Sequence, residues 1–417
     1  MSIKIAYITL GCKLNYAETS TYERELSKAG FEAVPWSKGA DVFVVNTCTV
    51  TEHSDKKSRN IIRKLHRQNP HAKIFVTGCS AQLRRADYEA IEGVVRVFGA
   101  TEKSLVVPYI IQNTSGTDCC GHDISTFFPA YSSGERTRSF LKVQDGCDYK
   151  CHYCTVPYAR GESRNIPIAD IIPQAEAIAA EGIKEIVLTG VNTGDFGKST
   201  GETFFELIKQ LNEVEGIERY RISSIEPNLL TEEMIDWIVT GTKFLPHYHI
   251  PLQSGCDTIL KEMGRRYDTA TFAHKIQYIR EKTEVPEGPK VFFGIDVIVG
   301  FPGETDELFM ETYNFLKDVV KPAFIHIFPY SRRAGTPAAA RKDQVQDSIK
   351  TQRVQMLEEL SARLHQEFMD ANKGVAEKVL FESTDKNGMM EGYTGNYIRI
   401  SRPYDPGQIG KIVDIVI

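Results

Sequence analysis

The chain has 417 residues, more than one ordinary hydrophobic core holds, so two or three domains are expected. Its composition, 41% hydrophobic and 25% charged, is typical of a soluble globular protein, and no apolar run is long enough to predict a membrane span. The formal net charge of −5 argues against capture of nucleic acid by overall charge, although a local basic patch remains possible.

The first ten residues alternate like a strand and lack the apolar core and cleavage site of a signal peptide. The chain also contains nine cysteines. Without an export signal, this number favours thiols that bind metal over disulfides. We therefore expect a cytoplasmic protein.

Three segments of the first domain, expected at residues 1–125, share one plan: a β-branched run ends in a cysteine. Ile3–Leu10 leads to Cys12, Val42–Asn46 to Cys48, and Ile74–Thr77 to Cys79. Helical patterns follow at 17–29 and 58–68, and strands that alternate with helices predict a parallel α/β sheet. The three cysteines would then meet at the carboxyl edge of the sheet, where such sheets bind ligands. A second three-cysteine cluster is favoured over ordinary buried cysteines; Cys119 and Cys120 follow no strand and are left out.

The segment 56–73 is strongly basic, and Asp55 is the only acidic residue from 53 to 73. Most of its positive charges fall on one helix with an apolar stripe. The helix face is either simply solvated or a surface that follows phosphates. The basic residues at its start are Lys56, Lys57, Arg59 and Arg63.

A C-x3-C-x2-C run, Cys147, Cys151 and Cys154, follows an apolar segment at Phe140–Val143. No fourth cysteine is near, whereas structural zinc sites and ferredoxin-type clusters normally take four protein ligands. His152 lies between two of the cysteines and is poorly placed to reach the same ion. The run therefore favours a four-iron cluster with one iron open to a substrate.

Residues 139–345 alternate between strand and helix six times, which predicts a partial (β/α)6 barrel of parallel strands. The expected strands are Phe140–Val143, Lys184–Thr189, Tyr220–Ser223, Tyr248–Leu252, Val291–Val299 and Phe324–Phe328. Polar residues and glycines at the strand ends form a candidate ring, because barrels place their chemistry there. They are Cys147, Gly190, Ser223, Ser224, Glu226, Gln253, Asp296, Gly300 and Tyr330.

The tail begins with an expected connecting helix at 346–372. Residues 373–417 show three short strand patterns, Ala376–Phe381, Tyr393–Ile400 and Gly410–Ile417. Such a short segment is near the lower limit for an independent core, so this small all-β module is expected to dock on the barrel.

Several motifs together identify a family that the chain resembles. They are Gly11-Cys12-Lys13-Leu14-Asn15, Asn46-Thr47-Cys48, Thr77-Gly78-Cys79, Val156–Gly161, Leu188-Thr189-Gly190, His249–Gly255, Gly264–Tyr267, Asp296–Thr305 and Pro329–Arg333, in addition to the Cys147–Cys154 loop. In this combination the chain resembles the radical S-adenosylmethionine methylthiotransferases, and the resemblance covers nearly its whole length.

The resemblance implies two 4Fe-4S clusters and S-adenosylmethionine as cofactors. The cluster on Cys147, Cys151 and Cys154 would bind S-adenosylmethionine and cleave it to a radical. The cluster on Cys12, Cys48 and Cys79 would carry the sulfur that is inserted. Motif position assigns the S-adenosylmethionine pocket to Tyr153, Gly190, Ser224, Glu226, Gln253 and Asp296.

The resemblance also implies that the tail is a TRAM domain, a small RNA-binding β-barrel, and that the partner is a tRNA anticodon stem-loop. Tyr393, Tyr397 and Arg402 are candidates for stacking on or contacting RNA. The other residues assigned to RNA are Lys56, Lys57, Arg59, Arg63, Arg332 and Arg399. A monomer that receives electrons from a low-potential donor of the flavodoxin or ferredoxin type is expected.

Three substrates compete within the family. Lys13 disfavours the branch that acts on a ribosomal-protein aspartate, which usually has proline there. The branch acting on isopentenyladenosine more often has glutamine. The Gly-Cys-Lys-x-Asn form and Thr189–Gly194 resemble the branch that modifies threonylcarbamoyladenosine next to the anticodon. A non-catalytic iron–sulfur or zinc protein that binds RNA or carries electrons is the alternative from another class.

Overall fold

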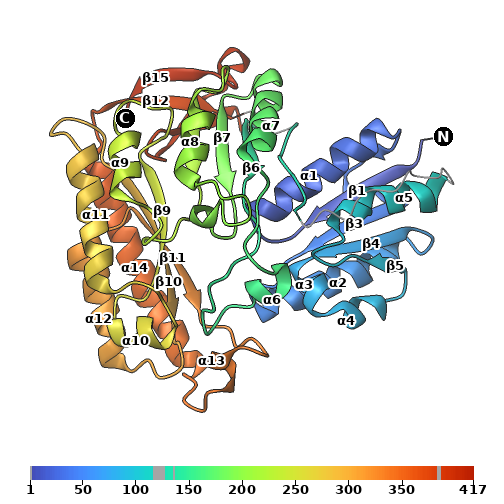
Figure 1. Cartoon of the computed structure of the whole chain (residues 1–417), viewed down its shortest axis with the longest axis horizontal. Coiled ribbons are helices and arrows are strands. Elements are labelled where there is room, and N and C mark those ends of the chain that lie inside the picture. Colours follow the sequence, from blue (N-terminus) through green and yellow to red (C-terminus); the bar gives the residue numbers. More distant parts are fainter. Residues whose placement is uncertain (1, 116–126, 135–136, 383–386) are drawn as a thin grey trace.

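The computed structural model describes residues 2–115, 127–134, 137–382 and 387–417. Figure 1 shows an amino-terminal α/β sheet beside a larger α/β body, with a small antiparallel sheet packed on that body. Cys119 and Cys120 lie outside the described residues. No helix in the described part of the chain is long and apolar enough to cross a membrane.

The amino-terminal sheet has the order β2-β1-β3-β4-β5, and every neighbouring pair is parallel. The strands are β1 (Lys4–Thr9), β2 (Glu32–Ala33), β3 (Val42–Thr47), β4 (Lys73–Gly78) and β5 (Val94–Val97), and the helices are α1 (Lys13–Lys28), α2 (Glu52–Gln68), α3 (Cys79–Leu83), α4 (Arg85–Glu89) and α5 (Val106–Ser115). The three expected strands are confirmed as the adjacent β1, β3 and β4. The edge strands β2 and β5 were not predicted because they are short: β2 has two residues, both exposed, and β5 has four, of which one is buried.

The central body contains six parallel strands in two three-stranded sheets, β6-β7-β8 and β9-β10-β11. An isolated parallel bridge between Ser224 and His249 links the two sheets. The strands are β6 (Arg138–Lys142), β7 (Glu185–Thr189), β8 (Arg219–Ile222), β9 (His247–Gln253), β10 (Phe292–Val299) and β11 (Phe324–Pro329). Each predicted strand of this region is present in the expected order, as six β/α units require.

Helices cover the outer faces of these strands (Figure 1). They are α7 (Ile168–Ala180), α8 (Phe204–Asn212), α9 (Glu232–Ile238), α10 (Asp257–Glu262), α11 (Thr269–Thr283) and α12 (Asp306–Asn314), which continues as a π-helical turn, Phe315–Val320; α6 (Val156–Arg160) and α13 (Pro337–Ala340) are short. The expected connecting helix is α14 (Asp347–Ala371), which packs along β11. Its Leu357, Leu360 and Leu364 join the core of the central body, so α14 is part of the body's packing as well as a connection.

The carboxyl-terminal sheet is antiparallel with the order β14-β13-β12-β15. Its strands are β12 (Ala376–Phe381), β13 (Met389–Thr394), β14 (Arg399–Pro403) and β15 (Ile412–Val416). The prediction of one strand over Tyr393–Ile400 is wrong, because the chain turns between β13 and β14. Thr394 Oγ1 accepts from the Ile398 amide at 2.8 Å, and Tyr397 has φ 67°, a left-handed conformation that interrupts an extended strand.

A fully buried ionic network joins the first domain to the central body. Glu18 Oε1 lies 2.6 Å from Lys103 Nζ, 3.1 Å from Lys142 Nζ and 3.2 Å from Arg160 Nη1. Asp145 completes the network at 2.7 Å from Lys142 and 2.9 Å from Arg160. Burial alone raises the pKa of Glu18, but the three cations outweigh it and hold the pKa well below its usual range. The contact therefore depends on ionised carboxylates.

Arginines of the barrel strands also hold the carboxyl-terminal sheet against the central body. Arg221 donates to the carbonyls of Thr394 at 2.7 Å and Gly395 at 2.8 Å. Arg138 forms an ion pair with Glu382 at 2.7 Å. The small module therefore docks on the central body, as expected from its size.

Candidate active site with two cysteine triads

The first triad comprises Cys12, Cys48 and Cys79, which follow the carboxyl ends of the adjacent strands β1, β3 and β4. A glycine precedes two of these cysteines for a steric reason. Gly11 has φ 103°, and a Cβ there would lie 2.7 Å from Cys48 Cβ. Gly78 has φ 104°, and a Cβ would lie 2.4 Å from the Thr47 carbonyl oxygen. The loops approach one another this closely only with glycine at both positions.

Arg160 contacts this triad from the central body. Its Nε donates to Cys79 Sγ at 3.1 Å, and its Nη2 donates to Asn15 Oδ1 at 2.6 Å. Burial raises the pKa of Cys79, and it raises the pKa of Cys48 to about 11. Bare thiolates are therefore disfavoured here, and a bound metal centre would supply the positive charge that stabilises them.

The second triad lies in the loop after β6. The Tyr149 amide donates to Cys147 Sγ at 3.4 Å, and the Val156 amide donates to Cys154 Sγ at 3.4 Å. Arg265 Nη1 donates to Cys151 Sγ at 3.2 Å. Burial raises the pKa of Cys147 to about 11 and that of Cys154 to about 12. Each triad therefore has one buried arginine directed at one sulfur.

The spacing of the sulfurs tests which metal centre the triads suit. Among the described residues, only His249, Asp296 and His326 bring three metal-ligating atoms within 4.8 Å of one another. Neither cysteine triad is among the compact groups of described residues, whereas sulfurs around a single zinc ion lie roughly 4 Å apart. His152 turns its Nδ1 to the Glu262 carbonyl at 2.7 Å, consistent with the expectation that it is no fourth ligand. The donor set fits a polynuclear iron–sulfur cluster at each triad.

A small cavity of about 190 Å³ opens beside Cys154. Three of the residues assigned to the S-adenosylmethionine pocket line it: Tyr153, Gln253 and Asp296. Gln253 ends β9 with φ 67°, so the chain bends where its side chain meets the cavity. We refer to this space as the cofactor cavity.

The other three assigned residues do not line the cofactor cavity. Glu226 is connected to it through Arg265, which pairs with the Glu226 carboxylate and donates to Tyr153 Oη at 3.2 Å. Burial raises the pKa of Glu226 even though Arg265 opposes this shift. Gly190 packs against Gln144 at the end of β7, and the Ser224 carbonyl accepts from Thr193 Oγ1 at 2.7 Å.

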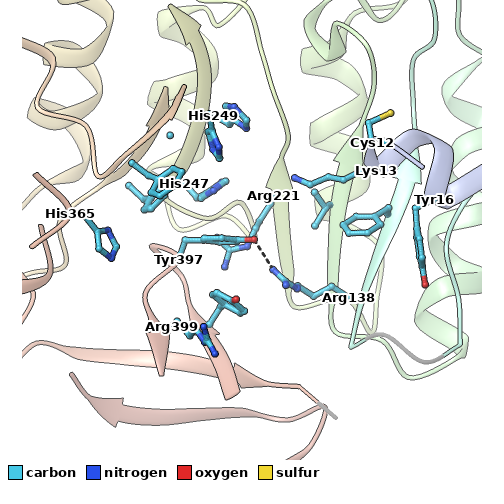
Figure 2. Close-up of a pocket in the computed structure, with 18 of the residues that line it drawn as sticks. Cys12, Lys13, Tyr16, Arg138, Arg221, His247, His249, His365, Tyr397 and Arg399 are labelled. Carbon is cyan, nitrogen blue, oxygen red and sulfur yellow. Dashed lines mark hydrogen bonds between the residues drawn. The ribbon is translucent and has the colours of Figure 1, made fainter. Parts of the chain in front are cut away.

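A larger cavity of about 860 Å³ lies between the first domain, the barrel strands and the carboxyl-terminal sheet. Figure 2 shows Cys12 and Lys13 on one side of it and Tyr397 on another. His249, which also lines it, has its Nε2 2.7 Å from Asp296 Oδ1. Because Asp296 lines the cofactor cavity, the two spaces meet at this pair. We refer to the larger space as the barrel cavity.

The residues assigned to RNA occupy different surroundings. Lys56, Lys57 and Arg63 are exposed on α2, whereas Arg59 is partly buried 3.8 Å from Asp87. Arg332 is exposed and lines a surface hollow with Glu52 and the exposed Tyr158. Arg399 is exposed, pairs with Glu391 and lines the barrel cavity.

All three tail residues considered for RNA stacking make contacts within the chain. Tyr397 lies between the barrel and the tail, with its ring centroid 4.7 Å from that of His247. The Arg402 guanidinium lies 5.1 Å from the Phe381 ring centroid. The ring of Tyr393 is tilted against that of Tyr397, with centroids 4.9 Å apart, and Tyr393 lines the barrel cavity.

Four residues of the site were not singled out from the sequence: Arg160, Arg265, His249 and His326. The first three lie inside the motifs that carry the family resemblance, so the sequence pointed to these positions but did not indicate what each residue does. His326 follows no motif. It reaches the site because β11 pairs with β10, which sets its ring 4.8 Å from that of His249.

Comparison with known proteins agrees with this geometry. A family model described as "Uncharacterized protein family UPF0004" matches residues 4–99, and one described as "Radical SAM superfamily" matches residues 141–316. The radical S-adenosylmethionine enzyme TsrM from Kitasatospora setae superposes with a TM-score of 0.58 over 81% of this chain and 77% of that one. At 15% identity this match shows the fold alone.

Full-length relatives are closer in sequence. The chain is 40% identical to the threonylcarbamoyladenosine tRNA methylthiotransferase MtaB of Bacillus subtilis (strain 168) over 99% of its length and 93% of the relative. It is 36% identical to the enzyme of that name from Aquifex aeolicus (strain VF5) over the full length of both. It is 33% identical to a tRNA-2-methylthio-N(6)-dimethylallyladenosine synthase of Carboxydothermus hydrogenoformans over 98% of its length and 95% of the relative. The chain therefore belongs to the radical S-adenosylmethionine methylthiotransferases, in the group of the threonylcarbamoyladenosine tRNA methylthiotransferases.

Proposed function

We propose that this enzyme adds a methylthio group to C2 of N6-threonylcarbamoyladenosine immediately 3′ of the tRNA anticodon. One observation carries the proposal. Cys12 of the first triad lines the barrel cavity, and the His249–Asp296 pair connects that cavity to the cofactor cavity beside Cys154. A base in the barrel cavity would thus lie between the two cysteine triads. The higher identity to enzymes named for threonylcarbamoyladenosine supports the choice of base.

The residues present fit two 4Fe-4S clusters, one on Cys147, Cys151 and Cys154 and an auxiliary one on Cys12, Cys48 and Cys79. When bound with S-adenosylmethionine, the first would supply a 5′-deoxyadenosyl radical, and the second would carry the sulfur that is inserted. Tyr153, Gln253 and Asp296 would hold S-adenosylmethionine in the cofactor cavity. Arg265 would orient Glu226 and Tyr153 around it.

The proteins and RNA that this enzyme meets follow from the same proposal. We propose that Lys56, Lys57 and Arg63 on α2, with Arg332, contact the phosphates of the anticodon stem-loop. The exposed ring of Tyr158 next to Arg332 offers a stacking surface for an unpaired base. Electrons would come from a low-potential flavodoxin or ferredoxin type of donor to a monomeric enzyme in the cytoplasm.

The division of labour follows the elements of the fold. Residues 1–125 would hold the auxiliary cluster and 139–345 the radical-generating barrel, with 346–372 leading to a TRAM-like module at 373–417. The antiparallel sheet β12–β15 supports such a module. Its Tyr393 and Arg399 line the barrel cavity, so the module would form part of the cavity wall in addition to any RNA contact.

Nucleoside mass spectrometry tests the substrate. tRNA from cells that lack this protein should contain threonylcarbamoyladenosine without its methylthio group, and re-expression should restore the group. Loss of the methylthio group from isopentenyladenosine instead would favour the other tRNA-modifying branch. Iron and sulfide analysis of anaerobically purified protein separates both from a non-catalytic alternative: two four-iron clusters per chain are expected, whereas zinc without sulfide would refute the enzyme.

A further inference from the structure

The barrel cavity has a strongly one-sided charge. No Asp or Glu lines it among the described residues, whereas Lys13, Arg138, Arg221 and Arg399 all do. Figure 2 shows these cations and several histidines around one space. The cavity therefore suits a ligand with a negative charge, provided that one of the cations is free to bind it.

Three of the four cations are already engaged. Arg138 pairs with Glu382 at 2.7 Å, and Arg399 pairs with Glu391. Arg221 Nε lies 2.8 Å from Glu185 Oε1, and both of its terminal nitrogens donate to backbone carbonyls of the tail. The charges of these three arginines are therefore balanced by carboxylates of the barrel and of the tail.

Lys13 differs from the three arginines. In the parts of the chain that the structure describes, its ammonium makes no hydrogen bond and no ion pair, although it has three protons to donate. It is the first residue of α1, directly after Cys12, and its side chain extends into the cavity (Figure 2). An uncommitted cation next to the auxiliary triad is therefore available to a bound substrate.

We propose that Lys13 binds the carboxylate of the threonine moiety of threonylcarbamoyladenosine. This inference rests on the proposed function and adds the basis of its specificity. C2 and C6 of adenine flank the same ring nitrogen, N1, and N6 is attached to C6. A base with C2 directed toward the Cys12 side therefore presents its N6 substituent on that side as well. The threonylcarbamoyl group ends in a carboxylate, whereas an isopentenyl group has no charge for Lys13 to bind.

Two synthetic anticodon stem-loops test the contact, one with threonylcarbamoyladenosine and one with its methyl ester, which removes the negative charge and adds one methyl group. Fluorescence anisotropy gives Kd for each RNA, and product formation gives kcat/KM. The wild-type enzyme should prefer the free acid by about tenfold or more, the usual contribution of a charge-assisted hydrogen bond. Lys13→Gln should lose this preference by binding the acid more weakly, while its Kd for the ester stays the same.

Two further variants separate charge recognition from other effects. Lys13→Arg keeps the positive charge and should retain most of the preference. Lys209→Gln, on the exposed face of α8 and outside both cavities, should behave like the wild type. Iron and sulfide contents are compared across all variants, so that a loss of cluster is not mistaken for a loss of recognition.

The outcomes distinguish the inference from the function on which it rests. If Lys13→Gln weakens the binding of both RNAs equally, Lys13 contacts an RNA phosphate or supports the fold. The inference is then wrong while the function stands. If the wild type binds acid and ester alike, the carboxylate is not recognised, and the inference fails again. If the wild type modifies only an isopentenyladenosine stem-loop, the proposed function itself is wrong.

Discussion

His249 Nε2 lies 2.7 Å from Asp296 Oδ1, and this contact is shared by the two cavities of the site. Asp296 faces the cofactor cavity from β10, whereas His249 faces the barrel cavity from β9. The two strands are hydrogen-bonded neighbours, so the sheet fixes this relationship. Asp296 in the cofactor cavity thus positions His249 in the barrel cavity, and His249 positions Asp296.

Separating this pair should uncouple cofactor cleavage from product formation. We expect His249→Ala to keep cleavage of S-adenosylmethionine but to lower the methylthio product by about tenfold or more, since a misplaced substrate loses much of its rate. Asp296→Ala should weaken S-adenosylmethionine binding itself. The ratio of 5′-deoxyadenosine to product measures the coupling; an unchanged ratio in His249→Ala would contradict this role.

Substitution of a cysteine in each triad should abolish a different step of the reaction. Cys151→Ala should abolish reductive cleavage of S-adenosylmethionine, because it removes one of the three ligands in the Cys147–Cys154 loop. Cys48→Ala should retain cleavage and lose sulfur insertion. Iron content and 5′-deoxyadenosine formation are measured together. Full product formation by Cys48→Ala would show that the first-domain triad carries no sulfur.

The arginines at the triads should set the reduction potentials of the two clusters separately. Arg160→Lys keeps the charge of the buried network but shortens the side chain that donates to Cys79 at 3.1 Å. Hydrogen bonds to cluster sulfurs favour the reduced state, so the auxiliary cluster should shift to a more negative midpoint potential. Arg265→Lys should do the same for the other cluster, because Arg265 donates to Cys151.

Redox titration followed by electron paramagnetic resonance measures both potentials in each variant. Each substitution should shift the midpoint potential of one cluster and leave that of the other cluster unchanged. Equal shifts of both clusters in either variant would indicate a general structural change in place of local tuning.

The buried network predicts a loss of stability in acid. Lys103, Arg160 and Lys142 hold the pKa of Glu18 below its usual range despite burial, and Lys142 and Arg160 hold that of Asp145 well below its own. Both folded pKa values are depressed, so the ionised carboxylates stabilise the fold above the unfolded values of about 4. This contribution is lost as the pH falls from there toward the folded values.

Substitution of Glu18 tests the same network at neutral pH. Glu18→Gln leaves buried cations with one carboxylate fewer and should lower the free energy of unfolding by about 3–5 kcal/mol. Its acid sensitivity should be smaller than that of the wild type. Urea unfolding at neutral and acid pH measures both effects, with the exposed Glu215→Gln as a control that should change little.

The sequence was most informative where local pattern and chain order determine position. The β-branched runs before Cys12, Cys48 and Cys79 predicted strands, and the rule that parallel strands end at one edge placed the cysteines together. The strand predicted over Tyr393–Ile400 failed because its β-branched and aromatic residues resemble a strand on both sides of a turn. Propensity does not detect a left-handed residue at Tyr397.

The contacts between arginines and cysteines that lie far apart in the chain could not be predicted from the sequence. Arg160 and Cys79 are 81 residues apart, and Arg265 and Cys151 are 114 apart. Neither contact has a local pattern, because the first depends on how the first domain packs on the barrel and the second on how distant segments of the barrel meet. Lys13 was visible as a motif residue, but only the structure shows that its ammonium has no partner among the described residues while the other cations around the barrel cavity are engaged.

Arg333 has a consequence for how the chain is assembled. It lies at the end of the barrel series, yet its guanidinium bonds to Asp55 at 2.7 Å and to Thr49 at 2.6 Å in the first domain. Domains generally fold in order of synthesis, so the first sheet can form early. Its docking is complete only after residue 333 has left the ribosome. A nascent chain would therefore pass through a stage in which the first domain is folded but not yet closed onto the barrel, when Cys12, Cys48 and Cys79 lie at an uncovered edge of its sheet.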